Sequence, residues 1–533
     1  MLKSKFVYTV FLFALFLTSC AKRGTISGGP KDTIPPVLIQ SAPKNFSTNF
    51  KGDFIKITFD EYIKVKDITK QLIISPPMKN APYITPMGSA SKFISIKLND
   101  TLLPNTTYSF NFGQSITDNN EGNPYSQFKY VFSTGDYIDS LKIGGVIKDV
   151  RSKKVDNFVN IQLYEAATFN DSTIFKERPR YVTNTLDSAT TFTLENLKEG
   201  KYHVIALKDG NNDFKYSPKT DKIAFYKKPI QVPNDTLFRL DLFKEEVAFK
   251  AVKPAQATNQ KLLLGYEGTL KKPQVKVKNG AQDISVLVTK FPKTDSLQIW
   301  LPKLTVDSLE TEVTQGNYSK RFVTKIKEMK AVDMLSFKAK LSGNINFSDV
   351  FAVNASIPIT KIDNSKITVT KKDSSAVAFT TKYLDFEQQI QIDFKTEESE
   401  KYKITALPGA FTDFYEAQND TLTYNLNTKK LTDYGNLKVT LENVNRFPVI
   451  VELLDNKETV ILSKYSEKET VFNFEAIEPR MYTLRVIYDD DKNGEWTTGN
   501  YLEKRLPEEV IYLPKEIDVR ANWDVEQPFT LTE

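Results

Sequence analysis

The sequence predicts an all-β protein that consists of several small β-sandwiches in tandem. Apolar and polar residues alternate with a period of two in many short stretches, such as residues 54–59 (FIKITF) and 389–394 (QIQIDF). Phe, Tyr, Ile, Val, Leu and Thr are abundant, Met is scarce, and no long amphipathic helical pattern is present. The 533 residues are enough for about four or five such domains.

The N-terminus has the pattern of a lipoprotein signal peptide. An apolar run of twelve residues, 6–17, is too short for a membrane span of about 20 residues but fits a signal peptide over residues 1–19. Residues 17–20 (Leu-Thr-Ser-Cys) resemble the lipobox of bacterial lipoproteins. The resemblance implies that Cys20, the single cysteine, is lipidated and becomes the first residue. The alternative is an ordinary secretory signal followed by a buried cysteine.

Residues 20–32 predict a lipidated, flexible tether, because they are rich in Gly, Ser and Lys. Surface-exported lipoproteins of the Bacteroidetes type usually carry acidic residues after the lipidated cysteine, whereas this chain has Ala21, Lys22, Arg23 and Gly24. The resemblance therefore implies a lipid anchor in the outer membrane and favours its periplasmic face over the cell surface. The membrane is then the first expected partner.

Charge and composition exclude several function classes. Removal of residues 1–19 takes away Lys3 and Lys5, so the formal net charge falls from +6 to +4, and no basic tract predicts nucleic-acid binding. One lipidated cysteine and one histidine, His203, exclude Ser-His-Asp and Cys-His catalysis and zinc sites of the His/Cys type. No residue is predicted to be catalytic, and His203 is expected to be an ordinary strand residue.

The patterning divides the rest of the chain into five modules. These are the first (33–137), second (138–243), third (244–332), fourth (333–432) and fifth (433–533) module. The third is β-patterned but resembles no family, and its Asn279-Gly280 pair predicts a tight turn.

The first module resembles the bacterial Ig-like domain of surface-layer proteins. The motifs are PPV at 35–37, LPNTTY at 103–108, ITDNNEGNP at 116–124 and FKYVFSTG at 128–135. The fourth module echoes it at a shift of 295–296 residues, which predicts a degenerate second copy. The acidic residues Asp60, Glu61, Asp118 and Glu121 could form an acid pair or metal site, but turn chemistry is the favoured interpretation.

The second module resembles the prealbumin-like or carboxypeptidase-regulatory-like sandwich, through GGVIKD at 144–149 and FTLENLKEGKY at 192–202. The fifth module repeats it at a constant shift of 280: Phe192, Tyr202 and Asp209 correspond to Phe472, Tyr482 and Asp489. A gapless match of 25 residues predicts a duplicated structural unit.

The loop inside this repeat is the best candidate site. Its second copy reads D-x-D-x-N-G-x-W from residue 489, like the first half of an EF-hand calcium loop, and Ca²⁺ prefers six to eight oxygen ligands. The alternative is a polar turn. No cofactor is required, and the predicted calcium ligands are Asp489, Asp491, Asn493 and Glu503, with Asp209, Asn211 and Asp213 in the first copy.

These features predict a rod-like, non-catalytic envelope lipoprotein that acts as a structural or interaction module. It would be an accessory subunit of an outer-membrane assembly, with a protein partner in the envelope. The alternative is a surface adhesin that binds carbohydrate or matrix, with Trp300, Trp496 and Trp523 as the available tryptophans.

Overall fold

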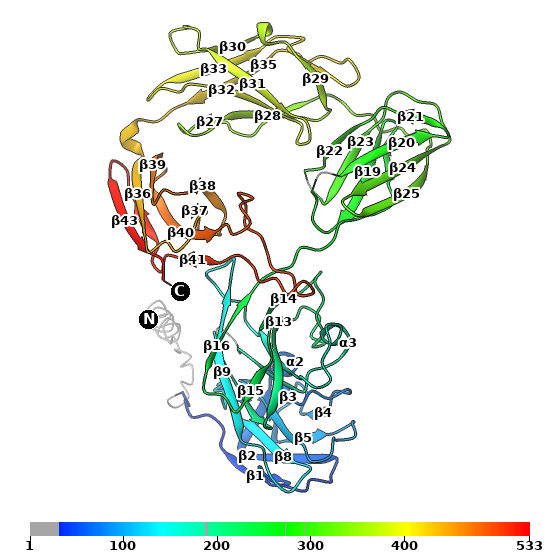
Figure 1. The fold of residues 1–533 in the computed structure, drawn as a ribbon, viewed down its shortest axis with the longest axis vertical. Coiled ribbons are helices and arrows are strands. Elements are labelled where there is room, and N and C mark those ends of the chain that lie inside the picture. Colours follow the sequence, from blue (N-terminus) through cyan, green and yellow to red (C-terminus); the bar gives the residue numbers. More distant parts are fainter. Residues whose placement is uncertain (1–30, 187–189, 272, 293, 533) are drawn as a thin grey trace, which may run out of the picture.

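The structure is a computed structural model that describes residues 31–186, 190–271, 273–292 and 294–532. The predicted signal peptide and Cys20 lie outside the described residues. Nearly all regular structure is β-strand (Figure 1). Five separate clusters of buried apolar side chains each belong to one of the five modules. The prediction of an all-β chain of tandem sandwiches is confirmed, whereas the boundaries between modules stay predictions.

The first module has two sheets packed over one core. One sheet has the order β1-β2-β5-β4, with β7 paired to the end of β2, and the other has the order β3-β6-β8. Alternation places Ile55, Ile57 and Phe59 in the core. The elements are β1 (Leu38–Ala42), β2 (Phe54–Val65), α2 (Ile68–Gln71), β3 (Ile73–Ser75), β4 (Tyr83–Thr85), β5 (Ser91–Lys97), β6 (Thr107–Asn111), β7 (Ile116–Asp118) and β8 (Lys129–Ser133).

The fourth module has a closely similar arrangement, with sheets β26-β28-β32-β31 and β27-β35-β33-β30 and the pair β29-β34. The echo in the sequence therefore corresponds to a repeated strand order. The elements are β26 (Phe337–Ala339), β27 (Gly343–Asn344), β28 (Phe351–Ala355), β29 (Ile359–Ile362), η2 (Asn364–Lys366), β30 (Ile367–Thr370), β31 (Phe379–Leu384), β32 (Gln389–Phe394), β33 (Lys401–Ala406), β34 (Phe411–Asp413), β35 (Leu422–Asn427) and η3 (Leu431–Asp433).

The second module has a sheet β11-β10-β13-β14, with β15 also on β13, and a sheet β12-β9-β16. In the latter, β16 runs parallel to β9. The elements are β9 (Leu141–Asp149), β10 (Asn160–Glu165), α3 (Thr173–Lys176), β11 (Tyr181–Asn184), β12 (Thr191–Leu197), β13 (Gly200–Lys208), β14 (Lys222–Phe225), β15 (Ile230–Val232) and β16 (Leu237–Leu242).

The fifth module repeats this topology strand for strand, with sheets β38-β37-β40-β41 (β42 also on β40) and β39-β36-β43, where β43 is parallel to β36. Tyr202 and Tyr482 also make the same bond, from the hydroxyl to the backbone oxygen four residues earlier. The elements are β36 (Gly435–Glu442), β37 (Val449–Leu454), β38 (Val460–Ser466), β39 (Val471–Ile477), β40 (Arg480–Tyr488), β41 (Val510–Tyr512), β42 (Ile517–Val519) and β43 (Asp524–Thr530).

The third module is a sandwich of the sheets β17-β19-β23-β22, with β18 on β19, and β21-β20-β24-β25. Gly280 has φ +58° in the tight turn between β20 and β21, as its sequence predicts. The elements are β17 (Lys250–Ala251), β18 (Ala255–Thr258), β19 (Lys261–Glu267), β20 (Gln274–Asn279), β21 (Gln282–Ile284), β22 (Leu287–Lys290), β23 (Ser296–Trp300), β24 (Ser308–Gln315) and β25 (Tyr318–Lys325).

The five modules do not form a straight rod. Figure 1 shows the second to fifth modules following one another around a circuit, so that the fifth returns to the second. A sixth apolar cluster joins these two modules and includes Tyr501 of the fifth among aromatic residues of the second. The rod-like arrangement is therefore wrong, and the alternative that the sequence leaves open, modules folded against one another, is the one observed. Long-range packing between modules leaves no periodic signal in the sequence.

Candidate functional site

The predicted calcium loop of the fifth module connects β40 to β41 and begins with Asp489, which is completely buried. One carboxylate oxygen of Asp489 accepts the Asn493 N–H at 3.1 Å, and the other accepts the Gly494 N–H at 2.9 Å. Gly494 has φ +79°, so the bend favours glycine. Asp491 is exposed and accepts bonds from the Asn493 side chain and the Thr497 hydroxyl, at 3.1 and 2.6 Å.

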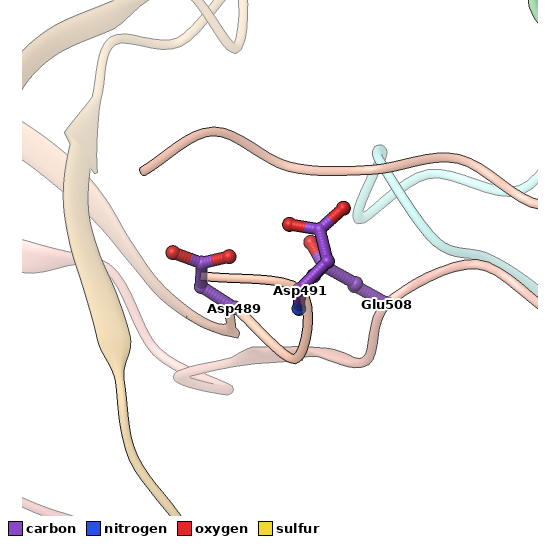
Figure 2. Close-up of side chains that lie close together, drawn as sticks. All are labelled: Asp489, Asp491 and Glu508. Atoms are coloured by element: carbon purple, nitrogen blue, oxygen red, sulfur yellow. Dashed lines mark hydrogen bonds between the residues drawn. The ribbon is translucent and has the colours of Figure 1, made fainter. Parts of the chain in front are cut away.

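The structure brings a third carboxylate, Glu508, to this pair. One oxygen from each of Asp489, Asp491 and Glu508 lies within 4.8 Å of the others (Figure 2). Glu508 is buried at the end of the loop and accepts the N–H groups of Asp491 and Thr497, at 3.2 and 2.8 Å. Burial raises the pKa of Glu508, and the charges of the two aspartates add to this effect, while the two N–H groups oppose it.

The three carboxylates match a hard divalent cation in charge and in donor type. Each of them already accepts at least one N–H group, so the cluster also closes the loop by itself. Both interpretations from the sequence, a calcium loop and a polar turn, thus have a structural counterpart. Calcium binding stays a prediction, now centred on three acids rather than two.

Two predicted ligands are placed differently from the expectation. Glu503 is exposed and pairs with Arg505 at 3.2 Å, outside the cluster that Glu508 completes. The reason is that the loop extends outward around Glu503 and returns through the backbone pairing of Asn500 with Arg505. The side-chain oxygen of Asn493 accepts the Glu495 N–H at 2.6 Å, so it supports the bend.

The first copy of the loop has turn chemistry throughout. Asp209 accepts three N–H groups, from Asn211, Asn212 and Phe214, at 2.7–3.0 Å. Burial still raises the pKa of Asp209 despite these bonds. Asp213 accepts the Lys215 N–H at 2.9 Å. Among the described residues, no third acid joins Asp209 and Asp213 in a metal-type group.

Sequence reasoning missed Glu508, although the first copy contains a signal for it. Asp221 is completely buried directly before β14 and accepts the N–H groups of Gly210 and Ser217, at 2.9 and 2.7 Å. Glu508 lies just before the corresponding strand β41 and closes its loop in the same way. A buried acid at the end of the first loop therefore predicts one at the end of the second.

The outer part of the fifth-module loop contacts the second module. Tyr501 is 1% exposed, and its ring centroid lies 5.3 Å from that of Phe225 and 6.0 Å from that of Phe175. Its N–H donates to the Glu245 carboxylate, and the Thr498 hydroxyl donates to the Lys244 carbonyl at 2.6 Å, both in the first residues of the third module, directly after the second. The loop therefore holds the two repeated modules together.

A buried ion pair reinforces this contact. Arg485 is 1% exposed and pairs with Glu452 at 2.6 Å. The same guanidinium donates to the Arg151 carbonyl of the second module at 3.2 Å. The Arg151 guanidinium in turn lies 4.8 Å from the ring centre of Trp496. The contact thus combines apolar, ionic and cation–π interactions.

Two of the four candidate acidic residues of the first module, Asp118 and Asp60, have structural roles. Asp118 is buried and accepts four N–H groups, from residues 120–123, at 2.7–3.0 Å. Desolvation acts to raise the pKa of Asp118, but these bonds lower it on balance. Asp60 accepts the Val37 N–H at 2.8 Å. Among described residues, Asp60, Glu61, Asp118 and Glu121 form no metal-type group, which supports the turn interpretation.

His203 lies half-buried on β13, and its ring stacks on Phe169 at 4.0 Å between centroids. Burial lowers the pKa of His203, and the nearby Lys504 lowers it further. These rings line a cavity of about 320 Å³, together with Tyr501 and Lys504 of the fifth module. Within the described residues, no nucleophile or acid is hydrogen-bonded to His203.

Comparison with known proteins identifies one domain. Residues 32–134 match the model of a bacterial Ig-like domain, which confirms the resemblance of the first module. No curated protein matches the chain. In the described part, no helix has the length and apolar character that a membrane crossing needs.

Solved structures with similar regions are multi-domain β proteins. They include the surface layer protein SbsC (11% identity, TM-score 0.16, covering 91% of this chain and 67% of that one). They also include BcpA, the major pilin subunit of Bacillus cereus (11%, 0.14, 73% and 99%), and the biofilm associated protein BSP domain (10%, 0.16, 76% and 99%). Scores this low do not show a common fold over the chain, so what the comparisons establish is a bacterial Ig-like domain at residues 32–134.

Proposed function

We propose that the chain is a non-catalytic, lipid-anchored lipoprotein of the outer membrane that acts as a structural or interaction module. The contact between the second and fifth modules carries this proposal, because it holds the tandem sandwiches in one arrangement rather than as an extended chain. The buried Tyr501 and the Arg485–Glu452 pair maintain that contact. A fixed arrangement suits an accessory subunit of an envelope assembly, which must hold partners at set positions.

Crosslinking in native outer membranes tests this role. A tag after Glu533, with Cys20 intact, allows recovery of crosslinked complexes. A stoichiometric envelope protein is expected in the recovered material. Recovery of the chain alone, from membranes in which known complexes crosslink normally, would contradict the accessory-subunit role.

The lipid anchor needs a separate test, since Cys20 lies outside the described residues. Cells that express the chain are labelled with a radioactive fatty acid, and the Cys20→Ala variant serves as the control. Label on the wild type alone, together with loss of the variant from the membrane fraction, is the expected result. Equal membrane association of both would refute anchoring through Cys20.

The alternative role is a surface adhesin for carbohydrate or matrix. The tryptophans give this role little support, because only one of the three is exposed. Trp300 is completely buried, and its ring N–H donates to Thr289 at 2.9 Å. Trp496 packs under Arg151, whereas Trp523 is 56% exposed. Protease added to whole cells separates the roles: a surface adhesin is degraded, and a protein on the periplasmic face, which we propose, is spared.

A further inference from the structure

Exposed aromatic side chains are concentrated in the first module. Eight aromatic residues are among the exposed large apolar residues of the described chain, and six of them lie between residues 33 and 137. These six are Phe46, Phe54, Tyr62, Tyr83, Phe93 and Tyr137. The other two, Tyr465 and Trp523, belong to the fifth module. Exposed apolar surface gathered in one of five similar sandwiches indicates an interaction surface.

Four of the six share the outer face of the sheet β1-β2-β5-β4. Each precedes an isoleucine that points into the core, so alternation directs the aromatic ring outward. Their exposed fractions are 49% for Phe54, 56% for Tyr62, 58% for Tyr83 and 39% for Phe93. In register, Phe54 on β2 pairs with Lys97 on β5, which pairs with Tyr83 on β4.

Lysines lie among these rings. The Lys56 ammonium is 4.2 Å from the ring centre of Phe93, and that of Lys92 is 5.6 Å from the ring centre of Tyr62. Asp60 is an acid of the same strand face, and it already accepts the Val37 N–H at the sheet edge. We call the set Phe54, Lys56, Tyr62, Tyr83, Lys92, Phe93 and Lys97 the aromatic–lysine face; with Asp60 included, its formal charge is +2.

We propose that the aromatic–lysine face docks on a bilayer surface that carries anionic phospholipid headgroups. Aromatic rings with polar surroundings partition to the headgroup level of a bilayer. Lysines near an anionic surface add attraction that a neutral surface lacks, and long lysine side chains extend toward phosphate while their stems stay on apolar surface. A neutral glycan would use the rings but would leave the three lysines without a role.

The position of the face in the chain agrees with this occupant. Seventeen residues separate Cys20 from Leu38, where β1 begins. They span at most about 60 Å when extended, so a lipid on Cys20 keeps the first module within reach of the membrane. This step rests on the proposed lipidation, whereas the composition of the face does not.

Vesicle binding of the unlipidated chain, residues 21–533, tests the proposal. Vesicles of phosphatidylethanolamine with phosphatidylglycerol are compared with neutral phosphatidylcholine vesicles in a sedimentation assay. We expect binding to the anionic vesicles and a drop of at least about 30-fold in the partition coefficient for K56E/K97E, since the loss of each lysine charge is the equivalent of about 1 kcal/mol and each new glutamate adds repulsion. The F54S/F93S variant should lose binding to a similar degree.

The matched control is K338E/K340E, which makes the same charge change at two exposed lysines of the fourth module. Its binding should stay within about threefold of the wild type, because charge loss distant from the bilayer acts weakly through screening. Circular dichroism verifies that each variant is folded. Equal losses in both lysine variants, or no binding of the wild type, would overturn the proposal. The chain carries no lipid in this assay. The result of the vesicle assay therefore does not depend on the outcome of the Cys20 labelling test.

Discussion

Replacement of Tyr501 by alanine should open the contact between the second and fifth modules. Tyr501 is 1% exposed and packs against Phe175, Tyr216 and Phe225, with ring centroids 5.3–6.4 Å apart. Truncation of a buried aromatic residue to alanine costs about 3–5 kcal/mol. A loss of about 3 kcal/mol lowers the ratio of closed to open chains by roughly 150-fold.

Distance measurement between spin labels detects this opening. The chain without residues 1–20 contains no cysteine, so cysteines at the exposed positions Lys176 and Glu467 give one unique label pair across the contact. The wild type should give one narrow distance distribution, and Y501A should give a broader and longer one. The control is Y465A, since Tyr465 is 44% exposed on the same module.

Replacement by phenylalanine sharpens the test. The Tyr501 hydroxyl is buried and has no hydrogen-bond partner among the described residues. Y501F keeps the ring and removes this unpaired group, so it should leave the contact intact or strengthen it, by up to about 1 kcal/mol. An unchanged distance distribution in Y501A, with unchanged protease sensitivity of the loop, would refute the role of Tyr501.

Three further predictions concern stability. E452A should lower the free energy of unfolding in urea by about 3–5 kcal/mol, because it leaves the buried Arg485 guanidinium without its carboxylate. E452L/R485M should recover most of that loss. Equal losses in E452A and E452L/R485M would contradict this prediction. The lowered pKa of Asp118 means that its ionised form stabilises the fold at any pH above the unfolded-state pKa, about 4. This stabilisation disappears as the pH falls through the lower folded-state pKa. The thermal unfolding temperatures at pH 7 and at pH 3 should therefore differ less in D118N than in the wild type. Calcium at 100 times its dissociation constant should raise the free energy of unfolding by about 2.7 kcal/mol. E508Q should abolish this effect and E503Q should not, and no calcium effect on the wild type would exclude the site.

The fold was largely predictable because strand alternation and the 280-residue repeat are local or periodic signals. Phe192 and Phe472, for example, occupy corresponding strands of two modules with one topology. The candidate site was half predictable. Asp489 and Asp491 lie close together in the sequence. Glu508 comes near them only through the fold, after a long loop whose length no local sequence pattern predicts. Trp300 shows the same limit, since composition cannot tell a buried tryptophan from an exposed one.

The difference in loop length explains why the fifth module has a role that the second module lacks. In the first copy, β13 and β14 are separated by residues 209–221, and Asp221 closes this short loop onto Gly210. In the second copy, residues 489–509 separate β40 from β41, so the loop is eight residues longer. Glu508 keeps the closing function of Asp221, and the added length carries Tyr501 out to the first copy.

The acid cluster at the base of the loop therefore affects the position of Tyr501 at its tip. Asp491 and Glu508 fix the base of the loop, and Tyr501 lies between them in sequence, at the tip that enters the second module. Any loosening of the base frees the tip to move, since the intervening residues hold each other through the Asn500–Arg505 pairing rather than through a sheet. Loss of Glu508 should therefore weaken the contact between modules even without a cation, and the label pair at positions 176 and 467 would show this as a broader distance distribution in E508A than in E503A.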